Sequence, residues 1–296
     1  LGFTVGSLLI GCFIGAFLAG RLADLFGRRN VMMVTALLFT VGALIQGFAH
    51  DHTIFIIARL CGGMAVGAAS VLSPAYISEV APASVRGRLT TLQQIMIIIG
   101  LTIAFVVNYF LAQSAGESTA PYWAGIEAWR WMYLMQAVPA VIFLVALPFI
   151  PESPRYLVSK GRVAKPVCVL STLFGRDIPS TKLAEIRATF AEDHRPRLSD
   201  IKGNGLFGIR KIVWAGIMLA VFQQLVGINV IFYYGETLWK LAGVSEAAAL
   251  QRNIISGVVS IAACVVTIMV IDKIGRKPLL LIGSAGMAVS LFAMLY

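Results

Sequence analysis

The chain has 296 residues, of which 58% are hydrophobic and 13% are charged, and its formal net charge is +10. Soluble globular domains average about 25% charged residues, so this composition excludes that class and indicates a polytopic membrane protein. The four cysteines show no paired spacing, which gives no support to a disulfide framework or a metal site. We expect no cofactor, no metal and no nucleic-acid partner.

Eight apolar runs have the length of membrane-spanning helices. They lie near 1–20, 31–49, 54–77, 90–112, 129–150, 212–239, 251–271 and 279–296. The predicted fold class is therefore an all-α polytopic membrane protein. Residues 151–211 form the long polar stretch between two groups of spans, so the predicted units are 1–150, a linker 151–211 with short helices, and 212–296.

Basic residues gather in alternate loops. Most of the 24 Lys and Arg lie in the connections 21–30, 78–89, 151–211 and 272–278. The positive-inside rule places these loops in the cytoplasm of a multi-pass cell-membrane protein. The net positive charge is thus read as a topology signal, with the lipid bilayer as the partner.

A short motif occurs twice, and its spacing indicates an internal repeat. Asp-Leu-Phe-Gly-Arg-Arg at 24–29 recurs as Asp-Lys-Ile-Gly-Arg-Lys at 272–277, each time after a span. Both copies are predicted on the same side, which is typical of parallel six-helix repeats in transporters. By this count, we expect one span to be missing before Leu1 and further spans after Tyr296, so that the chain is a piece of a longer protein.

The repeated motif also suggests a conformational role. Its glycines permit a tight turn, and its charged residues can bridge neighbouring helix ends in one conformation and release them in another. The alternative is simple anchoring by inside-positive charge. The residues concerned are Asp24, Arg28, Arg29, Asp272, Arg276 and Lys277.

A polar constellation lies inside the run 212–239. Gln223, Gln224 and Asn229 are costly in hydrocarbon unless something polar faces them, and Gly227 offers a place for the helix to open. Asn229 and Tyr233 are four residues apart and share a helix face. We interpret the stretch as a pocket wall for a neutral, hydroxyl-rich ligand. The alternative is hydrogen bonding between helices.

These residues resemble the sugar porters of the major facilitator superfamily, above all the bacterial proton–xylose symporters and, more distantly, glucose facilitators. The resemblance covers essentially the whole chain. Its carriers include the motif at 20–29, Pro-Glu-Ser-Pro-Arg at 151–155 and Gln-Gln-x-x-Gly-Ile-Asn at 223–229. It implies a fold of two six-helix bundles, of which this chain would run from the second helix to the ninth.

The resemblance also implies roles for individual residues. Gln94, Gln223, Gln224 and Asn229 would hydrogen-bond a sugar, with Tyr233 packed nearby. Arg59 would take part in proton coupling through an Asp on a preceding helix, or would instead snorkel or bond backbone carbonyls in every member. A cytoplasmic charge network that biases the conformation would contain Glu79, Arg86, Glu152 and Arg155, besides the two motif copies.

The expected function is a secondary transporter that moves a monosaccharide, a hexose or a pentose, by alternating access with proton symport, acting as a monomer. The alternatives are a facilitative sugar or polyol uniporter and a membrane sugar sensor that does not transport. An enzyme is not expected, because the spans hold no clustered carboxylates, no histidine pair and no nucleophile–base pattern. Leu101 stands where xylose symporters carry Gln, and Ser260 where the family often has Asn, so we expect a hexose to be accepted at least as well as xylose.

Overall fold

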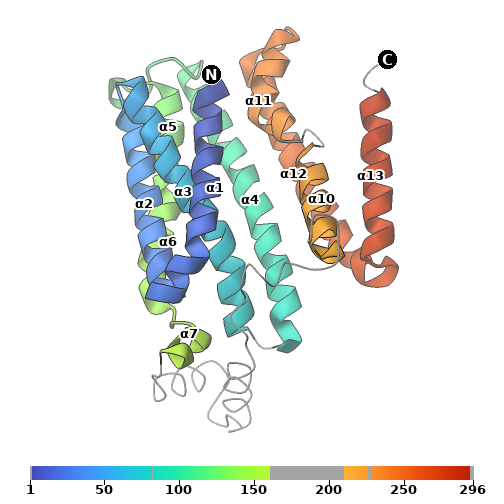
Figure 1. Cartoon of the computed structure of the whole chain (residues 1–296). Coiled ribbons are helices and arrows are strands. Elements are labelled where there is room, and N and C mark those ends of the chain that lie inside the picture. The colour runs from blue at the N-terminus through green and yellow to red at the C-terminus, as the bar shows by residue number, and fades with distance from the viewer. Residues whose placement is uncertain (1, 82, 161–209, 226–227, 294–296) are drawn as a thin grey trace.

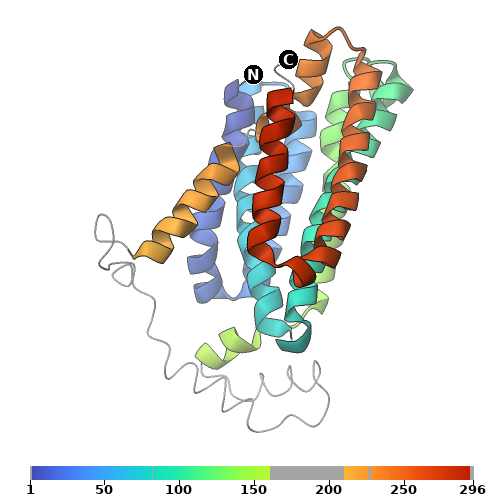
Figure 2. The ribbon, with the colours of Figure 1, turned by 90° about the vertical axis from the view of Figure 1, so that its right-hand side faces the viewer.

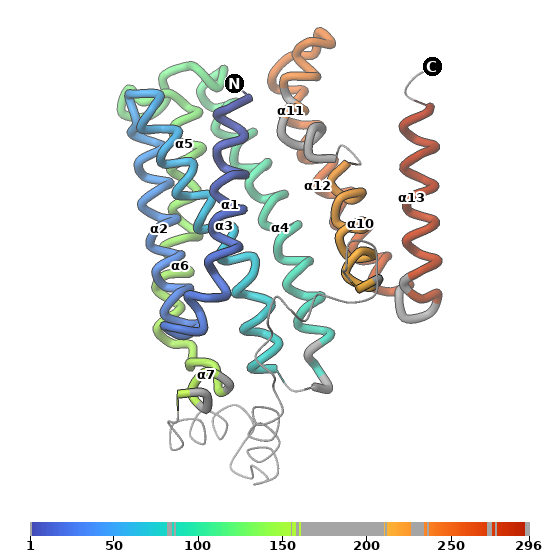
Figure 3. The backbone as a smooth tube through the Cα atoms, in the orientation of Figure 1, coloured from blue at the N-terminus to red at the C-terminus, as the bar shows by residue number. Residues whose placement is uncertain are grey.

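The structure, a computed structural model, describes residues 2–81, 83–160, 210–225 and 228–293, and these form helices joined by short turns (Figure 1). The same backbone is traced as a tube in Figure 3. The elements are α1 (Gly2–Phe26), α2 (Arg28–Phe48), α3 (His52–Val80), α4 (Ala83–Ala115), η1 (Trp123–Gly125), α5 (Ala128–Met135), α6 (Ala137–Ala146), η2 (Leu147–Phe149), α7 (Pro154–Ser159), α10 (Lys211–Leu225), α11 (Ile228–Leu241), α12 (Glu246–Ile274) and α13 (Arg276–Ala293).

Within the described ranges, six helical segments are long and apolar enough to cross a membrane. Five of them precede residue 160, as predicted: α1, α2, α3, most of α4, and the run Ala128–Phe149. This last run is divided into α5, α6 and η2. The break between α5 and α6 arises because Pro139 has no N–H to donate to the carbonyl of Met135. The sixth is the segment Glu246–Val270 of α12.

The predicted run 212–239 corresponds to two shorter helices. Helix α10 ends at Leu225 and α11 begins at Ile228, and residues 226 and 227 lie outside the described ranges, together with the predicted opening at Gly227. The linker residues 161–209 are outside them as well. Of the last predicted span, 279–296, only residues 294–296 are outside, and the rest belongs to α13.

Helices α1 and α3 pack on each other more closely than any other described pair, and glycines make this possible. A Cβ added to Gly11 or Gly15 of α1 would overlap the carbonyl oxygen of Leu60 or Met64 on α3. In return, a Cβ at Gly63 or Gly67 would overlap the backbone of α1. Small residues let transmembrane helices approach closely enough for backbone packing, which replaces the hydrophobic driving force that lipid does not supply.

The turns that carry the basic residues lie at one end of the bundle, at the bottom of Figure 1, which we call the basic end; the opposite end is the far end. A cluster of buried side chains packs α1, α2 and α3 against η2 toward the basic end. Its members are Ala19, Ala23, Val31, Met32, Ala36, Ala68, Leu72 and Leu147. These helices therefore form a rigid frame for the charged side chains at that end.

The first half of the chain packs against the second through helices α4 and α12, which lie side by side in Figure 1 and Figure 2. At the middle of the contact, a Cβ on Gly257 would lie 2.7 Å from Oγ1 of Thr102. Farther from the basic end, Leu111, Ala112, Ala249 and Leu250 are buried. Between residues 87 and 101 of α4, and between 258 and 270 of α12, the structure describes no buried residue.

Candidate functional site

The two copies of the repeated motif form the same turn. Helix α1 ends at Phe26 and α2 begins at Arg28; helix α12 ends at Ile274 and α13 begins at Arg276. The single residue between them is a glycine with positive φ in each case, 96° at Gly27 and 87° at Gly275. L side chains rarely adopt this backbone conformation, so the predicted role of both glycines as tight-turn residues is confirmed.

The first turn is completed by a carboxylate from a distant segment. Gly27 has no side chain with which to cap α2, and Oε1 of Glu152 accepts hydrogen bonds from the backbone N–H of Arg29 at 3.1 Å and of Ser153 at 3.0 Å. A carboxylate is favourable here because the N-terminus of a helix carries unsatisfied N–H groups and a partial positive charge. Glu152 therefore acts as the cap that Gly27 cannot provide.

Arg28 is the centre of an ion-pair network at the same turn. Its guanidinium contacts Asp24 at 2.8 Å, Glu79 at 3.1 Å and the carbonyl oxygen of Ala23 at 3.0 Å. The side chains of Arg28 and Glu79 are only 14% and 10% exposed, and Glu79 also accepts a hydrogen bond from the hydroxyl of Ser153. Removal of Arg28 would leave the buried charge of Glu79 without its cation, which is strongly destabilising.

Two tyrosines that were not among the predicted site residues complete the cluster. Tyr76 donates to the carbonyl of Pro151 at 2.7 Å, and Tyr156 donates to the carbonyl of Leu25 at 3.2 Å. The ring of Tyr156 lies 6.0 Å from the Arg28 guanidinium. These bonds join α1, α2 and α3 to residues 151–156 at the start of the linker, so they fix the basic end of the first unit.

Several predicted members of the charge network remain untested. The side chains of Arg86, Arg155, Asp272 and Arg276 lie outside the described ranges, and Lys277 is exposed. The structure therefore brings together Asp24, Arg28, the backbone of Arg29, Glu79 and Glu152. Their effect on conformational exchange stays a prediction.

Arg59 lies within α3, and its guanidinium is close to two aromatic side chains, Phe55 and Tyr133. Its Nη1 donates to the hydroxyl of Tyr133 at 2.8 Å, and the guanidinium lies 5.8 Å from the ring of Phe55 and 5.9 Å from that of Tyr133. Its Nε is buried and has no hydrogen-bond partner among the described residues. The sequence analysis missed Tyr133, because a tyrosine in an apolar run gives no local sign of the cation it meets.

The predicted sugar-binding residues come from two helices. Gln94 is exposed on α4, while Gln223 and Gln224 are exposed in the last turn of α10. Asn229 and Tyr233 belong to α11, and their side chains lie outside the described ranges. The joint sugar contact of these five residues therefore stays a prediction.

A pocket is present elsewhere, at the far end. It lies between α4 and the start of α12 and is lined by Tyr109, Ala112, Gln113, Gly116, Glu117, Glu246, Ala247 and Leu250. Tyr109 is fifteen residues beyond Gln94, which is about 22 Å along a helix. This pocket was not anticipated from the sequence, because it forms between segments far apart in the chain.

Comparison with known proteins agrees with this fold and these motifs. The family described as "Sugar (and other) transporter" matches residues 1–295. The chain is 45% identical to a glucose transport protein of Synechocystis over 98% of its own length and 62% of the relative. It is 39% identical to the D-xylose-proton symporter of Escherichia coli K12, over 99% of this chain and 62% of that protein.

Solved structures of sugar transporters also match this chain. The partially occluded inward open conformation of the xylose transporter XylE from E. coli matches with a TM-score of 0.84 and 36% identity, and the match covers 98% of this chain and 66% of that one. XylE bound to 6-bromo-6-deoxy-D-glucose matches with a TM-score of 0.83. The chain therefore spans somewhat less than two thirds of the length of these relatives.

The helical architecture and the structural match define the class: this is a multi-pass membrane protein with the major facilitator fold. Within that class, the chain belongs to the sugar (and other) transporter family. The fold and family expected from the sequence are both confirmed.

Proposed function

We propose that this protein is a secondary transporter that moves a monosaccharide across the cell membrane by alternating access with proton symport. The observation that carries the proposal is the family match along residues 1–295. The carboxamides of the predicted pocket are present in the sequence. Relatives with 36–45% identity are named as a glucose transport protein, a D-xylose-proton symporter and an arabinose-proton symporter. The substrate is thus a hexose or a pentose, and the reaction is transport rather than catalysis.

The proposed sugar site contains Gln94 from the first half and Gln223, Gln224, Asn229 and Tyr233 from the second. Each carboxamide offers two donors and an acceptor, which suits adjacent hydroxyl groups. A sugar that lacks one of these hydroxyls leaves a carboxamide unpaired, which allows the site to reject analogues. A site formed from both halves also fits alternating access, because rocking of the halves exposes it to one side at a time.

Arg59 is the proposed proton-coupling residue. A guanidinium stays charged at any accessible pH, so it can control when a nearby carboxylate takes up a proton. Tyr133 accepts one hydrogen bond from Arg59. A guanidinium has five N–H donors, so Arg59 can also bind a carboxylate. The charge cluster around Arg28 would bias the exchange between conformations.

The test is sugar uptake by cells or proteoliposomes that contain the intact protein. We expect uptake of labelled glucose and of xylose, with glucose accepted at least as well because Leu101 is aliphatic. Uptake should acidify the interior and collapse when an uncoupler removes the proton gradient. Uptake that is unchanged by the uncoupler would identify a facilitator, and sugar binding without uptake would identify a sensor. Strong uptake of xylose together with exclusion of glucose would contradict the expected specificity.

A further inference from the structure

The two halves of the chain meet at the far end of the bundle and separate toward the basic end. Along α4 and α12, the buried residues run from Thr102 and Gly257 in the middle to Ala112 and Ala249 near the far end. The described residues of both helices on the basic side of that contact are half-buried or exposed. Any motion that opens the far end must therefore separate α4 from the start of α12.

The side chain of Glu246 bonds to residues of both halves of the chain at the place where the halves meet. Oε1 of Glu246, the first residue of α12, accepts a hydrogen bond from the backbone N–H of Ser118 at 3.2 Å. Its other oxygen, Oε2, contacts Nζ of Lys240 at the end of α11 at 3.3 Å. Ser118 belongs to the loop after α4, so this bond crosses from the second half of the chain to the first.

The hairpin that carries Glu246 is itself held in place. The guanidinium of Arg252 on α12 lies 4.1 Å from the ring of Trp239 on α11, close enough for a cation–π interaction. Together with the pair Lys240–Glu246, this contact ties the two helices of the hairpin. The carboxylate that bonds to Ser118 is therefore presented by a hairpin whose two helices are already held together.

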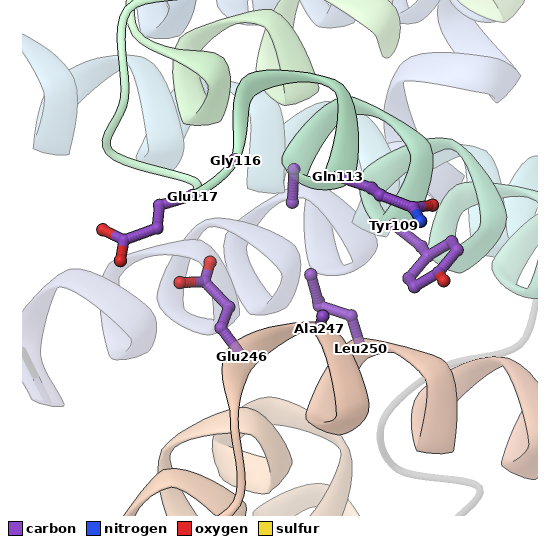
Figure 4. A pocket seen from close by; sticks show the side chains of 8 residues that line it. Tyr109, Gln113, Gly116, Glu117, Glu246, Ala247 and Leu250 are labelled. Carbon is purple, nitrogen blue, oxygen red and sulfur yellow. The ribbon is translucent and has the colours of Figure 1, made fainter.

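The pocket under this bond shows that the interface is not filled by apolar packing alone (Figure 4). Glu117 and Glu246 come from facing segments and lie on one side of it, while Tyr109 and Gln113 lie on the other. The Glu246 side chain is only 19% exposed. Since water is partly excluded there, the hydrogen bond to its charged carboxylate is stronger than one at an open surface.

We propose that Glu246 is the latch that holds the far end of the transporter closed, through its bond to the Ser118 amide and with Lys240 orienting its carboxylate. This inference rests on the proposed alternating-access function. Rocking about the Thr102–Gly257 contact opens the far end only when the bond from Glu246 to Ser118 breaks. The latch thus sets the balance between the conformation seen here and the one open at the far end.

The experiment measures the two ends separately with spin labels, in the intact protein in lipid, with its native cysteines replaced by serine. One labelled pair, at Thr119 and Ala242, reports the far end; the other, at Gly87 and Ile274, reports the basic ends of α4 and α12. In Glu246→Ala we expect a longer far-end distance together with a shorter basic-end distance. The population open at the far end should rise by roughly fivefold or more, the usual size of such couplings.

Three further variants distinguish loss of the latch from a general loss of protein stability. Glu246→Gln keeps an acceptor for Ser118 but loses the Lys240 pair, and Lys240→Gln keeps the carboxylate, so both should shift the distances in the same direction by less. Glu117→Ala removes a carboxylate from the same pocket and should not open the far end, because among the described residues its side chain has no bond across the interface. If Glu246→Ala fails to fold, the two glutamine variants supply the test.

A change confined to the far-end pair would show that only the loop loosens and would overturn the proposal. The same holds if Glu246→Ala behaves like Glu117→Ala. The distances are measured without sugar, so the latch and the proposed function can fail independently. A reciprocal shift in a protein that takes up no sugar would retain the latch and reject the transport proposal.

Discussion

Glycine 27 is required for two reasons, and only one of them applies to Gly275. Both residues have positive φ, but a Cβ on Gly27 would lie 2.5 Å from Oε2 of Glu152 and 3.0 Å from Cε1 of Tyr156. The space at Gly275 is open except for Cδ of Pro278 at 4.0 Å. A side chain at either glycine would strain the backbone, but only one at Gly27 would also displace the charge cluster. The same substitution at the two turns therefore distinguishes these two effects.

We expect Gly27→Ala to be more destabilising than Gly275→Ala. The backbone strain, about 1–2 kcal/mol, is common to both, and only Gly27→Ala also pushes Glu152 off the N-terminus of α2. The thermal unfolding midpoint in lipid or detergent measures the difference. If the cluster governs conformational exchange, Gly27→Ala should also lower the transport rate more than the affinity for sugar. Equal loss of stability in the two variants would show that Glu152 contributes nothing to the turn.

Gln224 is the residue at which the proposed sugar site and the alternative of hydrogen bonding between helices differ most clearly. Replacing it with Ala removes hydrogen bonds worth about 0.5–1.5 kcal/mol each, and more if a buried group is left unpaired. Sugar affinity should fall by roughly threefold to a hundredfold, since 1.4 kcal/mol is a factor of ten.

A double-mutant cycle with deoxy sugars provides the control for Gln224→Ala. The sugar that lacks the hydroxyl contacted by Gln224 should bind much more weakly than the parent sugar to the wild type, but only slightly more weakly to the variant. If every deoxy sugar loses the same affinity in both proteins, Gln224 bonds a neighbouring helix instead. Calorimetric titration of the purified protein gives the four affinities needed.

At the scale of elements, the frame of the first half depends on the contact of α1 with α3. Gly15 of α1 lies against the backbone of Met64, whereas Gly20 on the same helix faces open space. The apolar composition of α1 gives little preference for one face, so the glycines and alanines decide which face meets α3. Buried positions of α1 are indeed all small residues: Ser7, Gly11, Gly15, Ala19 and Ala23.

This contrast predicts different outcomes for the same substitution at two positions of α1. Gly15→Val should destabilise the protein by at least about 1–3 kcal/mol, because overpacking forces the two helices apart. Gly20→Val should change stability little, because a Cβ at this position would meet no atom within 4 Å. Thermal unfolding of the two variants, with expression level as a second reading, tests the prediction. Similar behaviour of both would mean that the close contact does not matter for stability.

At the scale of the whole molecule, the charge asymmetry of the two ends determines orientation. The turns at Gly27 and Gly275 and the segment around Glu152 lie together at the basic end, and the loop 116–127 lies at the far end (Figure 1). The positive-inside rule therefore predicts that the basic end faces the cytoplasm. The latch at Glu246 would then face the outside.

Single cysteines at two exposed positions test this orientation. Lys160→Cys at the basic end and Thr119→Cys at the far end, on a background without native cysteines, should react with a membrane-impermeant reagent from opposite sides. Intact cells should label Thr119→Cys alone, and inside-out vesicles should label Lys160→Cys alone. Labelling of both positions from one side would reject the predicted topology.

Properties that depend on local composition could be predicted from the amino-acid sequence alone. Span length, loop charge and the positive-φ glycines can be read from short windows, and the helices α1 to α4 and both glycine turns agree with that prediction. The repeated motif and the longer family motifs were enough for the fold class and family. The division of the run 129–150 into shorter helices was not predicted, because Pro139 disturbs the helix without ending the span.

The partners of individual charged side chains became known from the packing of the helices. Arg59 meets Tyr133 from 74 residues away, and Ser118 meets Glu246 from 128 residues away. No periodicity or spacing records such a pairing, because it depends on how apolar helices with several equivalent faces pack. Small residues on α1 and α3 select one packing, and that packing brings Glu79 and Glu152 to the turn at Gly27. At the other end, the contact of α4 with α12 brings Glu246 to Ser118.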